Sequence, residues 1–108
     1  MSIIKPGEVS MILQKHPNRI PVYITKSYSS NDIPDISRNK FLIPSEFLVS
    51  EFIYSIRKWI KLRPEQAIFI FINYSTPSYT DTMGQVYALY KKSDGLLHIT
   101  YSAENTFG

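Results

Sequence analysis

The chain has 108 residues, a net charge of +3 at neutral pH and no cysteine. This length fits a single domain, residues 1–108, that can bury a core without disulfide bonds. The hydrophobic content of 44% excludes an intrinsically disordered chain. The lack of cysteine excludes a disulfide framework, a thiolate zinc site and a cysteine nucleophile, and it is typical of a cytoplasmic protein.

The first part of the chain predicts one short helix and two strands. Residues 1–7 form a short extension without the long apolar stretch of a signal peptide. The apolar residues between positions 8 and 15 predict a short helix that ends before Pro17. β-Branched and aromatic residues then predict strands over 20–25 and 40–43, separated by a polar segment rich in turn formers.

A long amphipathic helix is predicted over residues 46–61. Ser45 is the expected N-cap, because its hydroxyl can accept a hydrogen bond from a free amide of the first turn. Apolar residues recur every four positions and form one stripe along this helix: Leu48, Phe52, Ile56 and Ile60. Such a stripe indicates a helix that packs on a hydrophobic core.

The last part of the chain predicts two strands and a second short helix. Residues 67–74 are apolar on both alternating faces, as in a strand covered on each side. Thr82 is the expected cap of a short helix that continues to Tyr90, and residues 96–101 predict the last strand. Residues 102–108 remain as a flexible C-terminal tail. This order predicts an α+β fold with a mixed sheet.

No catalytic group is predicted from the residues. His16 and His98 have no nucleophile or metal-ligand spacing around them and are interpreted as structural, and Asp94 belongs to a turn. We therefore expect no enzyme activity and no cofactor or metal. The mild basic charge predicts contact with anionic lipid or an acidic peptide, or simply a solvated face. It lacks the dense basic stripe of a nucleic-acid-binding protein, so no nucleic-acid partner is expected.

Six segments, in order along the chain, resemble the autophagy-related ubiquitin-like modifiers. This is the family of the GABA-receptor-associated protein and of microtubule-associated-protein light chain three. The segments are KHPNRIPV (15–22), KFLIPS (40–45), IRK (56–58), AIFIFIN (67–73), TMG (82–84) and the final TFG (106–108). The resemblance implies a ubiquitin-like β-grasp fold preceded by a short N-terminal helix. The first of the family's N-terminal helices is expected to be missing, because few residues precede Glu8.

The resemblance also implies two surface pockets for a peptide that adds a strand beside the second strand. The aromatic pocket maps onto Glu8, Ile12, Pro21, Tyr23, Lys40, Leu42 and Leu96. The aliphatic pocket maps onto Phe41, Ile43, Pro44, Phe47, Phe52 and Ser55. Phe52, in the helix stripe, also fits plain core packing. Arg19, Arg38 and Lys40 are expected to face acidic residues of the peptide.

The function implied by the resemblance is that of an autophagy modifier joined through Gly108 to phosphatidylethanolamine. The implied partners are activating and conjugating enzymes, a deconjugating cysteine protease, cargo receptors with aromatic-x-x-aliphatic motifs, and the membrane surface. The implied location is the cytoplasm, and the autophagosome membrane after lipidation. Two alternatives remain open: a protein-to-protein modifier of the ubiquitin type, and a non-covalent peptide-binding adaptor. Ser55, Trp59 and Leu96 differ from the usual family residues, so we expect a different motif preference.

Overall fold

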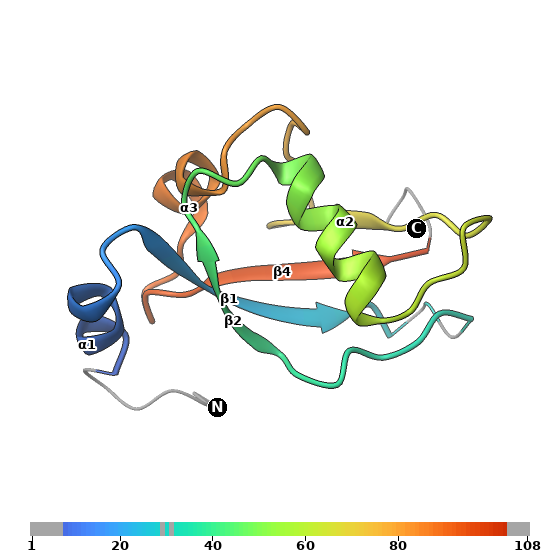
Figure 1. Cartoon of the computed structure of the whole chain (residues 1–108), viewed down its shortest axis with the longest axis horizontal. Coiled ribbons are helices and arrows are strands. Elements are labelled where there is room, and N and C mark those ends of the chain that lie inside the picture. The colour runs from blue at the N-terminus through green and yellow to red at the C-terminus, as the bar shows by residue number, and fades with distance from the viewer. Residues whose placement is uncertain (1–7, 29, 31, 104–108) are drawn as a thin grey trace.

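The computed structural model describes residues 8–28, 30 and 32–103. Figure 1 shows the elements, which follow one another in the order α1 (Glu8–Lys15), β1 (Arg19–Lys26), β2 (Lys40–Pro44), α2 (Val49–Trp59), β3 (Phe69–Phe71), α3 (Met83–Tyr90) and β4 (Leu97–Ser102). The predicted order of helices and strands is confirmed. Among the described residues no helix is long and apolar enough to cross a membrane.

The four strands form one sheet in the order β2-β1-β4-β3. β1 and β4 pair in parallel, and the two outer strands are antiparallel to their neighbours. This confirms the predicted α+β fold with a mixed sheet. In Figure 1, α2 crosses one face of the sheet, whereas α1 lies at the end of the molecule where β1 begins.

The main core lies between α2 and the central strands. Phe52 and Ile56 of α2 are fully buried, and so are Val22 and Ile24 of β1. They form a continuous apolar cluster with residues of β3 and β4. Burial of one such side chain contributes about 2 kcal/mol, so this cluster is the main source of stability. The core interpretation of Phe52 is confirmed.

Helix α2 is shorter than predicted, and its cap is a different residue. It begins at Val49, after Leu48 as N-cap, and not after Ser45. The backbone carbonyls of Ser45 and Phe47 instead accept hydrogen bonds from the N–H groups of Gly84 and Met83, at 2.8 and 2.7 Å. These bonds hold residues 45–47 against the start of α3, and these residues therefore do not form the first turn of α2.

The second short helix has the predicted cap, and the last two strands differ from prediction at their ends. Thr82 Oγ1 accepts the Gln85 N–H at 3.2 Å, and Gln85 Oε1 accepts the Thr82 N–H at 2.9 Å, which completes a capping box. β3 spans three residues only, and the chain turns after it at Asn73 and Tyr74, which have positive φ. Ser102, expected in the tail, is buried in β4.

The loop between β1 and β2 is held against the end of β4. The Tyr101 hydroxyl donates to the Pro34 carbonyl at 2.8 Å, and the hydroxyls of Ser30 and Ser102 lie 3.0 Å apart. Burial, with the negative charge of Asp35 as a second cause, raises the pKa of Tyr101 to about 12. The hydroxyl therefore remains a hydrogen-bond donor across the physiological pH range.

Helix α1 packs on a small separate cluster. Val9 and Leu96 are buried together, with Leu13 and Tyr23 beside them. Gly95 precedes Leu96 with φ of +84°, and a Cβ added there would lie 2.6 Å from Val9 Cγ1. Glycine is therefore required at this position, both for its backbone conformation and for the close approach of α1.

Substitution of Gly95 by alanine should lower the free energy of unfolding by about 2 kcal/mol. Both the left-handed backbone and the Val9 contact oppose the new methyl group. Urea denaturation measures the effect. In a Val9→Ala background the same substitution should cost less, because the obstructing Cγ1 is gone. An equal cost in both backgrounds would show that Val9 does not limit this position.

Candidate functional site: the free edge of β2

Strand β2 lies at the edge of the sheet and pairs with β1 on one side only, as far as residues 8–28, 30 and 32–103 are concerned. Pro21 lies opposite Leu42 and has no N–H to donate, so this pair is not a hydrogen-bonded one. In an antiparallel pair of strands, hydrogen-bonded and non-hydrogen-bonded residue pairs alternate. Ile24, for example, donates its N–H to the Asn39 carbonyl at 2.8 Å, three positions along β1 from Pro21. The N–H and C=O groups of Lys40 and Leu42 therefore point outward. This edge can accept another strand.

A concave pocket of about 180 Å³ opens beside β2, near α1. Five of the seven residues expected in the aromatic pocket line it: Ile12, Pro21, Lys40, Leu42 and Leu96. Val22, Arg38 and Phe41 also line it. Tyr23 does not, because it packs with Val9 and Leu96, and its ring centroid lies 5.6 Å from that of His98. The side chain of Glu8 lies outside the described part of the chain.

The turn before β4 fixes Leu96 in this pocket. Asp94 Oδ1 accepts the Leu96 N–H at 2.9 Å, and Asp94 Oδ2 lies 2.8 Å from His98 Nε2. Burial acts to raise the pKa of the Asp94 carboxyl, but the hydrogen bonds and the charge of His98 outweigh it and lower the pKa. The Tyr87 hydroxyl donates to the Gly95 carbonyl at 2.6 Å. His98 and Asp94 are thus structural partners in this turn.

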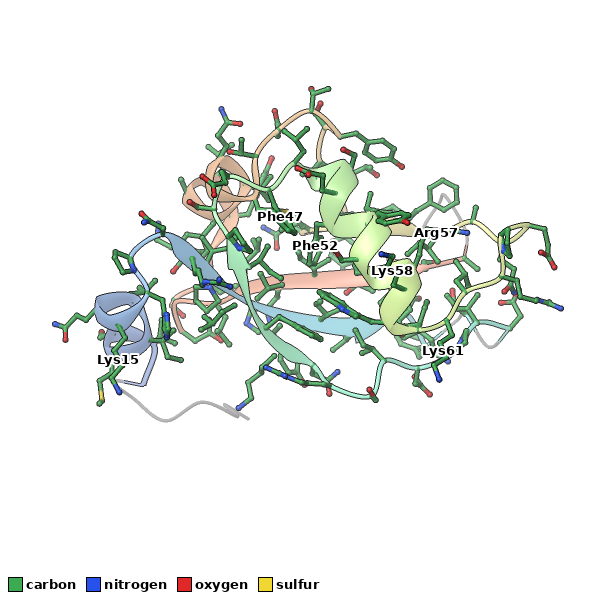
Figure 2. The ribbon with its side chains drawn as sticks, in the orientation of Figure 1. Lys15, Phe47, Phe52, Arg57, Lys58 and Lys61 are labelled. Carbon is green, nitrogen blue, oxygen red and sulfur yellow. The ribbon has the colours of Figure 1, made fainter. Side chains whose placement is uncertain are left out.

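Of the residues expected in the aliphatic pocket, Phe41 and Phe47 pack against the core cluster between α2 and the sheet. Phe52 and Ile43 are buried in the core and present almost no surface. The other four are partly exposed: Phe41, Pro44, Phe47 and Ser55. Figure 2 shows Phe47 and Phe52 in the region between β2 and α2. The Ser55 hydroxyl donates to the Glu51 carbonyl at 3.1 Å and is therefore already satisfied.

Trp59 is an additional member of this face. Its ring stacks on Phe41 with a centroid separation of 4.2 Å and an interplanar angle of 4°. It also meets Phe52 edge-on at 6.4 Å. The sequence marks Trp59 as unusual but does not place it here, because the contact depends on the distance between α2 and β2.

Two arginines donate hydrogen bonds to outward-pointing carbonyls of β2. Arg38 Nε donates to the Lys40 carbonyl at 3.0 Å, and Arg19 Nη1 donates to the Leu42 carbonyl at 3.4 Å. The Arg38 guanidinium also lies 5.1 Å from the centre of the Phe41 ring. The three cations expected to face an acidic peptide, Arg19, Arg38 and Lys40, therefore border the free edge, in agreement with a positively charged rim.

Arg57 and Lys58, in the last turn of α2, make contacts within the domain. Arg57 donates to the carbonyls of Gln66 and Arg63, at 2.7 and 3.1 Å. Lys58 Nζ lies 4.8 Å from the centre of the Tyr54 ring. Figure 2 places Lys58 and Lys61 toward the C-terminal end of α2. Within the described residues no cluster of three metal-ligating side chains occurs.

A mixed sheet crossed by one helix, with extra helical structure before it, defines the class of ubiquitin-like proteins with an added N-terminal helix. Residues 5–108 match the sequence model of the family described as autophagy protein Atg8, ubiquitin like. Autophagy-related protein 8 of Candida glabrata is 47% identical over 104 residues, which are 96% of this chain and 87% of that protein. That of Vanderwaltozyma polyspora is 50% identical over 101 residues, 94% of this chain and 85% of the relative. The chain belongs to the Atg8 family of ubiquitin-like autophagy proteins.

Solved structures agree with this assignment. The crystal structure of Trypanosoma brucei ATG8 has a TM-score of 0.84 and 35% identity, covering 94% of this chain and 87% of that one. Plasmodium falciparum Atg8, solved in complex with an Atg3 peptide, also has a TM-score of 0.84 and 35% identity, with coverage of 94% and 89%. The β-grasp prediction is thereby confirmed. The expected loss of the first family helix concerns residues 1–7, outside the described part.

Proposed function

We propose that this protein is an autophagy modifier that is joined to phosphatidylethanolamine through Gly108 and recruits partners through short peptides bound at β2. The free edge of β2, with apolar surface on both of its faces, is the observation that carries the proposal. Residues three apart in an extended peptide point to opposite faces of a sheet. An aromatic-x-x-aliphatic peptide therefore fits one apolar residue into each face while its backbone pairs with β2.

The proposed partners follow from this edge and from Gly108. Cargo receptors and adaptors bind through the peptide motif, while activating and conjugating enzymes and a deconjugating cysteine protease act on the C-terminus. The peptide partner of Plasmodium falciparum Atg8, which comes from Atg3, supports a conjugating enzyme among them. The proposed location is the cytoplasm, with the autophagosome membrane as the site of the lipidated form. Gly108 lies outside the described residues.

Replacement of Leu42 by aspartate should weaken binding of an aromatic-x-x-aliphatic peptide by about 10- to 100-fold. The wild-type affinity is expected near micromolar, about −8 kcal/mol. The new carboxylate would face the peptide's aromatic ring without a partner. Isothermal titration calorimetry measures the loss. Leu89→Asp is the matched control, because Leu89 is 74% exposed on α3 and does not line the pocket. Equal affinities for wild type and Leu42→Asp would place the peptide elsewhere.

Association with acid-flanked peptides should slow when salt is raised from low to physiological ionic strength. The cause is screening of Arg19, Arg38 and Lys40 along the edge of β2. In stopped-flow measurements Arg38→Gln should show a weaker salt dependence than the wild type. Arg63→Gln removes the same charge in a loop, where Arg63 pairs with Glu65, and should behave like the wild type. Salt-independent association of the wild type would leave these cations without a steering role.

Deletion of Gly108 should abolish the membrane-bound form without affecting folding or peptide binding. Glycine suits activation of the C-terminal carboxyl because it carries no side chain and threads a narrow enzyme channel. A lipid with two acyl chains then holds the domain on a bilayer, since each buried CH₂ contributes ~0.8 kcal/mol.

Flotation of membranes from autophagosome-forming cells compares wild type with the deletion, and calorimetry on the purified proteins controls for peptide binding. Flotation of both proteins would contradict conjugation through Gly108. Mass analysis of the cellular wild-type protein identifies the alternative chemistry. A lipid adduct supports the proposal, whereas an isopeptide-linked product or only unmodified chain overturns it.

A further inference from the structure

Trp59 continues the face of α2 that meets β2. It lies four residues after Ser55 and seven after Phe52, which are spacings that place side chains on one side of a helix. One flat side of its ring covers Phe41 at 4.2 Å, yet 37% of the residue is exposed. Phe41 is itself only partly buried. The exposed part of Trp59 therefore offers apolar surface beside the partly exposed Phe41 at the start of β2, separate from Pro44 and Phe47 at its end. The Arg38 guanidinium lies 5.1 Å from the centre of the Phe41 ring and borders this surface.

The alternation of side chains in a strand determines which peptide residue meets this surface. In the aromatic-x-x-aliphatic motif, the first x position lies two residues before the aliphatic residue. Side chains two residues apart in a strand share a face, so the first x residue and the aliphatic residue both point to the α2 face. Positions two apart along a strand are separated by ~7 Å. Phe41 precedes Ile43 by two residues on the same face of β2. A peptide parallel to β2, with its aliphatic residue near Ile43 and Pro44, places the preceding α2-facing residue beside Phe41 and Trp59.

We propose that Trp59 and Phe41 form a third apolar subsite, which selects an apolar residue directly after the aromatic residue of the peptide motif. This inference rests on the proposed peptide-binding function and adds a specificity-determining residue to it. Ser55, one turn earlier, contributes little apolar surface, and its hydroxyl is bonded to the Glu51 carbonyl. Phe52 and Ile56 are fully buried, so on the side of α2 that carries Phe52 and Ser55 the exposed apolar surface lies at Trp59.

The test uses peptides that differ only at this position, with leucine, alanine or aspartate, and with phenylalanine as the motif's aromatic residue. The wild type should prefer leucine over alanine by roughly tenfold, the effect of burying a few CH₂ groups. In Trp59→Arg this ratio should fall to about twofold or less, and Trp59→Phe should retain most of it. The second x residue of the motif points to the other face of the sheet. Replacing it should therefore change peptide affinity by the same factor in the wild type, Trp59→Arg and Trp59→Phe. Comparison of peptides within one protein keeps the result independent of small changes in stability.

A spectroscopic readout is available because Trp59 is the only tryptophan in the chain. Its emission should shift to shorter wavelength, and its quenching by acrylamide should fall, on binding the leucine peptide but much less on binding the alanine peptide. An unchanged leucine preference in Trp59→Arg, or an unchanged tryptophan spectrum, overturns the subsite while peptide binding stands. Failure of every peptide to bind overturns the proposed function and the subsite together.

Discussion

The parallel pairing of β1 with β4 is the constraint on which the rest of the molecule depends. It aligns Val22 with Leu97 and continues to Lys26 and Tyr101, so strands from the two ends of the chain form the centre of the sheet. Parallel strands require a long connection, and here the connection contains β2, α2, β3 and α3. Among the strands that the structure describes, β4 takes one side of β1 and β2 takes the other, so the outer side of β2 has no strand partner. The edge at which we propose that peptides bind is thus a result of the topology.

An edge strand with unsatisfied backbone groups risks pairing with other copies of the chain. Here Arg38 and Arg19 donate to the outward carbonyls of Lys40 and Leu42. A peptide strand bound as proposed would replace these donors with its own N–H groups. Acidic residues beside the motif would then offer the displaced guanidinium groups new partners. The same side chains can therefore protect the empty edge and favour a particular class of ligand.

The sequence predicts most elements, because their signals are local. Thr82 caps α3 as expected, and three residues of the predicted apolar stripe are buried: Phe52, Ile56 and Ile60. The fourth, Leu48, is 37% exposed because it is the N-cap of α2 and lies before its first turn. The start of α2 is missed because the carbonyls of Ser45 and Phe47 bond to α3, which is distant in the chain. The family resemblance correctly predicts five residues that line the aromatic pocket, whereas Tyr23, also expected there, packs against His98. The stack of Trp59 on Phe41 joins two elements, so no local pattern reveals it.

The position of Leu96 and Ala103 at opposite ends of β4 has a geometric consequence. The intervening strand, Leu97–Ser102, has six residues and is therefore ~20 Å long. Leu96 lines the pocket, whereas Ala103 is the last residue that the structure describes. If the domain is anchored through Gly108 as proposed, β4 separates the attachment end of the domain from the pocket. A domain held in this way could lean or rotate about its last strand while the proposed peptide-binding edge stays clear of the membrane.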